Sequence, residues 1–162
     1  MLKGLQRATG EFVLFQDADL EYDPRDYAAL IEPVTEHGAQ VVIGSRFIAP
    51  RMTRVFYFWH KMGNRLITLV FNLLNNTTFT DIYSCYLLYQ RSLVPVESIR
   101  TRSWEQHGEI LSLAVGKAKV LYEVPVSYRG RSYAEGKKIR PSDIFRVFYV
   151  LILTRLRRVL DR

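Results

Sequence analysis

The chain has one cysteine, Cys85, so it cannot form a disulfide within itself, and we expect a reducing compartment. We interpret Cys85 as a packed thiol rather than a nucleophile. No uncharged apolar run approaches the roughly 18 residues that a membrane-spanning helix needs. Residues 1–7 begin polar and lack the apolar centre of a secretory signal. The sequence therefore predicts neither a disulfide-rich secreted domain nor a conventional spanning helix.

Acidic residues are scarce in the last part of the chain. Residues 129–162 carry ten Lys or Arg and only three Asp or Glu, which accounts for the whole net charge of +7. Such a segment suits a diphosphate, an anionic membrane or a nucleic acid, or forms a solvated helix face. The apolar content of 48% in 162 residues excludes disorder and predicts a single domain.

Apolar runs alternate with helical patterns along the chain. Residues 12–15 and 40–43 read as strands, and Asp23 with Pro24 begins a helix that ends at Gly38. Further helices are expected over 52–75, 105–116 and about 142–160, a helix or turn over 92–99, and strands over 83–89 and 119–124. This order predicts an α/β fold with a mainly parallel sheet.

The most informative motif is Asp17-Ala-Asp19, which directly follows the first predicted strand. Two carboxylates at positions i and i+2 of an extended segment point roughly the same way. Because like charges repel, a cation between them explains the pairing, and oxygen ligands favour Mg²⁺ or Mn²⁺. Mg²⁺ prefers few protein ligands together with substrate phosphates, which implies a diphosphate substrate. The alternative is an ordinary Asp-rich turn.

Further motifs follow in order: Gly44-Ser-Arg46, Thr80-Asp81, and the segments 123–128 and 133–139. Together with residues 16–24, they resemble the family 2 glycosyltransferases of the polyprenyl-phosphate type, which include the dolichyl-phosphate mannose and glucose synthases. The resemblance covers about residues 5–158. It implies a partial GT-A fold, a Rossmann-like mixed and mainly parallel sheet flanked by helices. It also implies inverting, metal-dependent transfer of a sugar from a nucleotide diphosphate sugar to a polyprenyl phosphate.

The resemblance assigns roles to five residues. Asp17 and Asp19 would bracket the Mg²⁺ or Mn²⁺ ion, with Glu21 as a further ligand or a surface charge. Arg46 would lie near the phosphates, where a guanidinium fits phosphate geometry. Asp81 would orient the acceptor or the metal shell, or merely cap a turn.

Four more basic residues receive substrate roles from the same resemblance. Arg131, Lys137 and Lys138 belong to a glycine-containing loop that relatives close over the diphosphate. Arg65 would receive the acceptor phosphate, although an arginine beside an apolar run more often snorkels or pairs.

Relatives carry a strand–helix–strand unit for nucleotide recognition before the segment that matches residues 16–19. Only about ten residues precede the first strand here, and a βαβ unit needs roughly 30. The chain therefore resembles an N-terminally truncated enzyme whose sheet has an exposed edge. A missing N-terminal chain or a partner subunit would have to supply nucleotide binding.

We divide the chain into a truncated GT-A domain, 1–140, and a basic amphipathic helix, 141–162. The helix is expected to lie on the cytoplasmic face of a membrane through one apolar stripe, or to pack on the domain's own core. The stripe comprises Ile144, Val147, Phe148, Leu151, Ile152 and Leu156.

Three competing functions remain at this level. A phosphatase of the haloacid-dehalogenase type also has Asp-x-Asp after a strand, but it favours Thr or Val where this chain has Glu21. A non-catalytic membrane-surface or subunit-interaction fragment agrees with the missing strands. Nucleic acid is not an expected partner, because the basic helix is too rich in Ile, Leu and Val.

Overall fold

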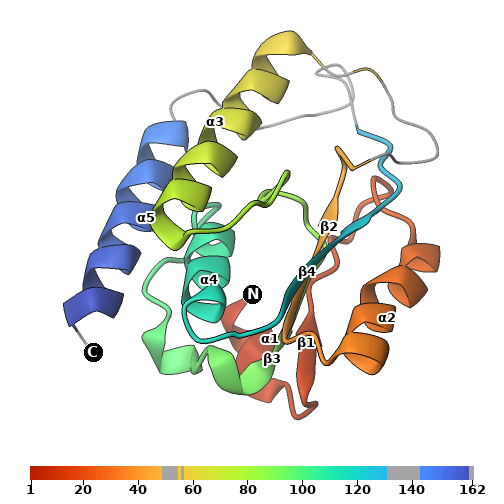
Figure 1. The fold of residues 1–162 in the computed structure, drawn as a ribbon, viewed down its shortest axis with the longest axis horizontal. Helices are drawn as coiled ribbons and strands as arrows, with labels where there is room; N and C mark the ends of the chain where they lie inside the picture. Colours follow the sequence, from red (N-terminus) through yellow and green to blue (C-terminus); the bar gives the residue numbers. More distant parts are fainter. Residues whose placement is uncertain (49–54, 56, 131–142, 161–162) are drawn as a thin grey trace.

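A four-stranded mixed sheet forms the centre of the molecule (Figure 1). The computed structural model describes residues 1–48, 55, 57–130 and 143–160. The strands are β1 (Phe12–Leu14), β2 (Val41–Ser45), β3 (Leu87–Gln90) and β4 (Leu121–Pro125), in the order β1-β3-β2-β4. β3 is antiparallel to β1 and β2, whereas β4 is parallel to β2. Three strands thus point the same way, although two of the three pairings are antiparallel. This confirms the predicted mixed α/β sheet.

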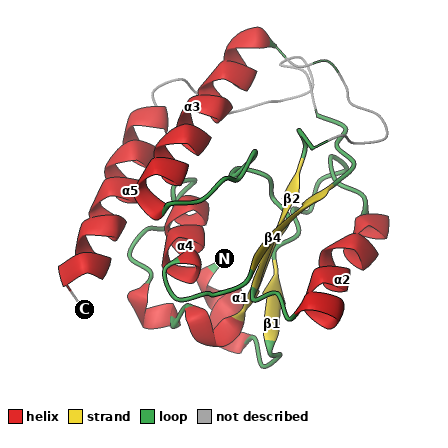
Figure 2. Ribbon diagram, in the orientation of Figure 1, coloured by secondary structure: helices red, strands yellow, loops and turns green. Residues whose placement is uncertain are grey.

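Helices cover both faces of the sheet (Figure 2). The helices are α1 (Leu2–Arg7), α2 (Tyr27–His37), α3 (Phe58–Asn75), α4 (Gln106–Val115) and α5 (Asp143–Leu160). Three short 3₁₀ turns span Pro24–Asp26, Arg91–Leu93 and Val96–Ser98. Because side chains alternate along a strand, Val42 packs with Leu30 of α2, while Val41 and Ile43 join the core beneath α3, α4 and α5. The fold therefore has three layers, with α2 on one face of the sheet.

The local signals around α2 are confirmed. The Asp23 side chain accepts a hydrogen bond from the Arg25 amide, and Pro24 begins the short 3₁₀ turn that leads into the helix. Gly38 ends α2 with a φ of 64°, in the left-handed region that glycine adopts without strain.

Two predicted boundaries were wrong. The helix expected over 52–75 begins at Phe58, since Val55 and Tyr57 are not helical; residues 52–54 and 56 lie outside the described part. The strand expected over 83–89 begins at Leu87. The Cys85 amide donates to the hydroxyl of Tyr22 instead of to a neighbouring strand, and the Tyr86 carbonyl still accepts from the Gly44 amide of β2.

The apolar stripe predicted for the C-terminal helix is split between the core and the surface. Val147 and Leu151 are each 1% exposed and belong to the main core, whereas Ile152 and Leu156 are 45% and 53% exposed. The stripe was too wide, since its members spread over about half of the helix circumference. The six residues therefore do not form one membrane-facing stripe, and contact of the helix with a membrane stays a prediction. None of the helices in the described residues is long and apolar enough to cross a membrane.

A half-buried arginine fixes the end of α5 against α3 and α4. Arg158 Nη1 donates to Asn75 Oδ1 at 2.6 Å and to the Ser112 carbonyl at 2.7 Å. Space for the guanidinium exists because residue 116 is glycine: a Cβ there would lie 2.1 Å from Arg158 atoms.

We expect Arg158→Met to lower the free energy of unfolding by about 1.5–3 kcal/mol, the usual contribution of hydrogen bonds to a charged group. Urea unfolding followed by circular dichroism measures the change. Arg157→Met is the matched control, because this side chain projects about 100° away around the helix. Equal losses in the two variants would contradict a specific role for Arg158.

Candidate functional site

The predicted site residues converge at one edge of the sheet. Asp17 and Asp19 follow β1 and Arg46 follows β2, while Glu123, which was not predicted, is the middle residue of β4. Because these strands are parallel to one another, their carboxyl ends meet at the same edge. β3 runs the other way, so the segment that leads into it, including Asp81, arrives at this edge too. Ligands of open α/β sheets bind at this kind of edge.

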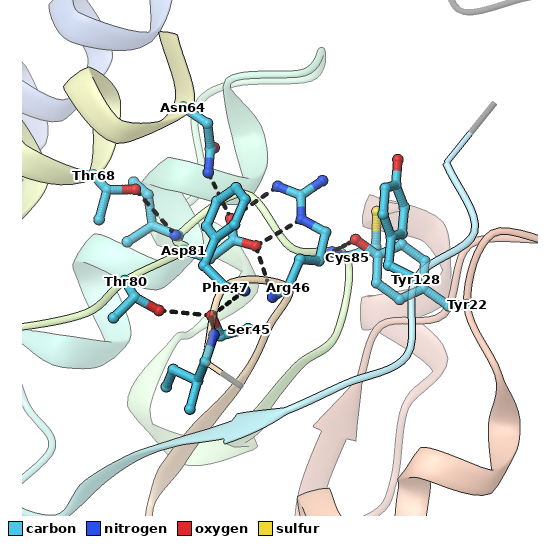
Figure 3. A network of polar contacts seen from close by, with 12 residues as sticks. Tyr22, Ser45, Arg46, Phe47, Asn64, Thr68, Thr80, Asp81, Cys85 and Tyr128 are labelled. Atoms are coloured by element: carbon cyan, nitrogen blue, oxygen red, sulfur yellow. Dashed lines mark hydrogen bonds and ion pairs between the residues drawn. The ribbon is translucent and has the colours of Figure 1, made fainter. Parts of the chain in front are cut away.

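A buried ion pair between Arg46 and Asp81 forms the centre of the site (Figure 3). Arg46 Nε donates to Asp81 Oδ2 at 2.6 Å, and Nη2 donates to Oδ1 at 2.8 Å. The Arg46 amide also donates to Oδ2, and Asn64 Nδ2 of α3 donates to Oδ1 at 2.9 Å. The Asp81 side chain is fully enclosed and that of Arg46 is 14% exposed. Both carboxylate oxygens are therefore engaged twice.

The electrostatics of this pair favour its charged form. Burial alone raises the pKa of Asp81, but the charge of Arg46 and the hydrogen bonds from Arg46 and Asn64 outweigh it and leave the pKa below its usual range. For Arg46, burial lowers the pKa, but Tyr22 and Asp81 outweigh burial and leave it well above the ordinary value. The guanidinium and the carboxylate thus remain ionised at neutral pH.

Glu123 supports the turn that presents Asp81. Its carboxylate accepts hydrogen bonds from the Thr80 amide at 2.9 Å, the Thr80 hydroxyl at 3.0 Å and the Asp81 amide at 3.0 Å. The Thr80 hydroxyl also lies 2.6 Å from Ser45 Oγ at the end of β2. Burial raises the pKa of Glu123, and the hydrogen bonds from Thr80 offset part of this. Strand β4 thus holds the turn at residues 80–81 in place.

An aromatic layer lies beside the ion pair. Arg46 Cζ is 5.0 Å from the ring centroid of Tyr128, within the range of a cation–π contact. Tyr22 packs between Tyr128 and Tyr86, with centroids 5.0 Å and 4.9 Å away. The Tyr128 hydroxyl donates to Glu21 Oε2 at 3.2 Å, and burial raises the pKa of Tyr128 to about 12. One oxygen of Glu21 is therefore engaged with the segment after β4.

The two aspartates of the Asp-x-Asp motif sit at the outer side of this network. Asp17 is exposed, and one of its carboxylate oxygens accepts a hydrogen bond from the Cys85 thiol. Asp19 Oδ1 accepts from the Glu21 amide at 3.1 Å, which shapes the loop after β1. Burial and the contact with Asp17 raise the pKa of Cys85 well above its usual value, so the thiol stays neutral and agrees with a packed role.

The donor set fits a divalent cation that takes part of its coordination from a substrate. Among the described residues, no three acidic, histidine or cysteine side chains gather into a set that could hold a metal alone. Asp17 and Asp19 offer carboxylate oxygens at a solvent-accessible edge. Two carboxylates, with waters and phosphate oxygens completing the shell, match the coordination that Mg²⁺ prefers. Glu21 as a third ligand stays a prediction.

Of the remaining predicted site residues, one is exposed and three lie outside the described residues. Two residues that contribute to the site, Asn64 and Glu123, were not predicted. Arg65 is exposed on α3, while its neighbour Asn64 reaches Asp81. The loop residues Arg131, Lys137 and Lys138 lie outside the described residues. The roles of Asn64 and Glu123 had no local signal, because their partners lie 17 and at least 42 positions away in the sequence.

A family model described as "Glycosyl transferase family 2" matches residues 1–95. The chain belongs to this family. It is similar to UDP-N-acetylglucosamine–dolichyl-phosphate N-acetylglucosaminyltransferase from Methanococcus voltae, at 29% identity over 149 residues, or 90% of this chain and 59% of that protein. It is also similar to dolichol-phosphate mannosyltransferase from Pyrococcus furiosus, at 26% identity over 86% of this chain and 40% of that protein. The chain thus spans less than two thirds of the length of each of these relatives.

Solved structures of other proteins share the fold of this chain. Glucosyl-3-phosphoglycerate synthase from Mycobacterium tuberculosis in complex with uridine diphosphate matches with a TM-score of 0.61 and 18% identity. The match covers 97% of this family 2 chain and 52% of that protein. The same enzyme in complex with Mn²⁺, UDP-glucose and glycerol 3-phosphate gives a TM-score of 0.56. This confirms the predicted Rossmann-like GT-A architecture.

Proposed function

We propose that this domain transfers a sugar from a nucleotide diphosphate sugar to a polyprenyl phosphate, with a divalent metal ion and inversion at the anomeric carbon. The observation that carries the proposal is the meeting of Asp17 and Asp19 with the Arg46–Asp81 pair at one edge of the sheet. The family match and the names of the two dolichyl-phosphate relatives support the substrate classes.

Asp17, Asp19 and Arg46 would all act on the diphosphate leaving group. Asp17 and Asp19 would hold Mg²⁺ or Mn²⁺, which supplies Lewis-acid neutralisation of the diphosphate. Arg46 would donate to the same phosphates from a guanidinium already oriented by Asp81. In the transfer, an acceptor phosphate oxygen bonds to the anomeric carbon as the bond from that carbon to the diphosphate breaks, which inverts the configuration.

Asp81 acts in this proposal as a positioning residue rather than as a base. Its two oxygens each accept two hydrogen bonds, and its pKa lies below the usual range. Such a carboxylate is a poor proton acceptor. None is demanded, because a phosphate acceptor is already anionic near neutral pH. Asp81 would hold Arg46 and, through Asn64, the start of α3 in register.

A non-catalytic role as a subunit-interaction fragment is the second candidate. Within the described residues, β1 hydrogen-bonds to β3 alone, so its outer edge is open for another strand. In that case a partner chain would complete nucleotide binding, and this chain alone would not catalyse transfer.

The proposal is tested by incubating the protein with radiolabelled UDP-N-acetylglucosamine, UDP-glucose or GDP-mannose, a short polyprenyl phosphate and Mn²⁺. We expect one labelled, organic-extractable product, lost when EDTA removes the metal and restored by excess Mn²⁺. A phospho-enzyme trapped at Asp17 would instead support the phosphatase alternative. Absence of product with every donor, from protein that is folded by circular dichroism, would contradict activity of this chain.

A further inference from the structure

Tyr128, which follows β4, contacts both halves of the candidate site. Its ring centroid lies 5.0 Å from Arg46 Cζ, and its hydroxyl donates to Glu21 Oε2 at 3.2 Å. Arg46 is the residue proposed to hold the phosphates. Glu21 belongs to residues 17–22, which we call the metal loop because it carries the Asp-x-Asp motif. One side chain therefore connects the metal loop with the phosphate-binding arginine.

Backbone contacts hold Tyr128 against the metal loop. Tyr22 and Tyr128 form an isolated antiparallel bridge, and the Arg129 amide donates to the Glu21 carbonyl at 2.8 Å. The ring also lies against Gly130, where an added Cβ would be 2.6 Å from Tyr128 Cε1. The position of the ring is therefore set by the backbone on one side and by the space that a glycine leaves on the other.

A second series of contacts joins the same ring to the motif itself (Figure 3). Tyr128 packs on Tyr22 with centroids 5.0 Å apart, and the Tyr22 hydroxyl accepts from the Cys85 amide at 3.2 Å. The Cys85 thiol in turn donates to Asp17 Oδ2 at 2.6 Å. Tyr22 is only 5% exposed, so these contacts run through the interior of the protein. Arg46 and the carboxylate of Asp17 are thus linked through adjacent side chains, with Tyr128 next to the arginine.

The ion pair with Asp81 does not supply this link. Among the described residues, the Asp81 side chain accepts hydrogen bonds from Arg46 and Asn64 and from no residue of the metal loop. Asp81 therefore orients the guanidinium relative to β2 and α3. The spacing between Arg46 and the metal loop depends instead on Tyr128.

We propose that Tyr128 is a positioning residue that sets the spacing between the metal loop and Arg46, so that one diphosphate can contact the metal ion and the guanidinium together. The inference rests on the proposed function, because it assigns both groups to the same diphosphate. Metal on the loop alone or phosphate on Arg46 alone does not need this spacing. A diphosphate that bridges the two does need it, since a displacement of about 1 Å is enough to lose a productive contact.

The test compares the affinities for Mn²⁺ alone, for inorganic pyrophosphate alone and for the Mn²⁺–pyrophosphate complex. Electron paramagnetic resonance measures Mn²⁺ binding, and calorimetry measures the other two. We expect the unaltered protein to bind the complex at least about tenfold more tightly than either component, because the second contact is then intramolecular. Tyr128→Leu should weaken binding of the complex by about tenfold and leave each single affinity within about twofold, since it disturbs only the spacing.

Two further variants separate the ring of Tyr128 from its hydroxyl. Tyr128→Phe keeps the ring beside Arg46 and removes only the donor to Glu21, so its affinity for the complex should lie between those of Tyr128→Leu and the unaltered protein. Gly130→Ala keeps every contacting group but displaces the ring, because the new Cβ would occupy its place. It should therefore weaken binding of the complex as Tyr128→Leu does.

Tyr27→Phe is the matched control. The Tyr27 hydroxyl donates to Gln16 Oε1, directly before the metal loop, and its ring packs on Tyr86 rather than on Arg46. This variant should bind the complex as the unaltered protein does.

The outcomes distinguish this inference from the proposed function. Equal binding of the complex by Tyr128→Leu and the unaltered protein would overturn the role of Tyr128 and leave the proposed transfer untouched. Equal weakening of the complex and of each component would also overturn it, because Tyr128 would then only support the fold. Binding of the complex by the unaltered protein no tighter than that of Mn²⁺ alone would contradict the shared diphosphate site, and the proposed function with it.

Discussion

Replacing Asp81 with alanine is expected to lower the free energy of unfolding by about 3–5 kcal/mol, a large share of the stability of a typical domain. The change leaves Arg46 enclosed with no carboxylate, and an unpaired buried charge is costly. It also removes the acceptor for Asn64, which ties α3 to the sheet edge. Urea unfolding monitored by circular dichroism measures the loss.

The exposed ion pair between Arg25 and Asp23 provides the matched control. The Arg25 side chain is 84% exposed, so Arg25→Ala should lower the free energy of unfolding far less than Asp81→Ala does. Replacing both members of the buried pair, as Arg46→Met with Asp81→Leu, should recover part of the loss, since no charge is then left alone. Equal losses of unfolding free energy in Asp81→Ala and Arg25→Ala would show that the buried pair stabilises the fold no more than the exposed pair does.

The same pair predicts a dependence on pH. The pKa of Asp81 is lower in the folded protein than the ordinary value of 3.8, so folding favours the ionised form. The resulting stabilisation is present above about pH 4 and is lost as the pH falls through the folded pKa. Asp81→Ala should therefore unfold with a shallower acid dependence below pH 4 than the unaltered protein.

Local signals allowed much of the fold to be predicted. The apolar run over residues 12–15, the Asp23–Pro24 helix start and the Gly38 stop each act within a few residues, and each was confirmed. The convergence of Asp17, Asp19 and Arg46 followed from the parallel strands that carry them. These features depend on interactions between residues close together in the chain, so a single sequence is enough to predict them.

The features that were predicted wrongly or missed depend on contacts between residues far apart in the sequence. Glu123 holds the turn at residues 80–81 from another strand, and no spacing rule links such positions. The apolar positions of α5 are on its inner and outer sides alike, so the sequence did not reveal that Val147 packs inward while Leu156 is exposed. Only the packing of α5 on α3 and α4 separates the two groups. The shift of β3 to Leu87 has the same origin, because Tyr22 takes the Cys85 amide.

Replacing Asp19 is expected to abolish metal-dependent transfer in the active protein. Asp19→Ala and Asp19→Asn should each reduce kcat by about a thousandfold or more, or roughly 4 kcal/mol in barrier, because neutralisation of the leaving diphosphate is lost. The measurement is transfer of labelled sugar to a polyprenyl phosphate over a range of Mn²⁺ concentrations. Mn²⁺ binding followed by electron paramagnetic resonance gives a readout that does not depend on turnover.

The asparagine variant separates metal binding from loop geometry. Asp19 Oδ1 accepts a hydrogen bond from the Glu21 amide, and an asparagine oxygen can accept the same bond while carrying no charge. If the role of Asp19 is only to shape the loop, Asp19→Asn should retain transfer and Asp19→Ala should lose it. If Asp19 holds the metal, both variants should lose transfer and Mn²⁺ binding together. Cys85→Ser, which retains a donor toward Asp17, should keep both, since the neutral thiol contacts the motif without carrying charge.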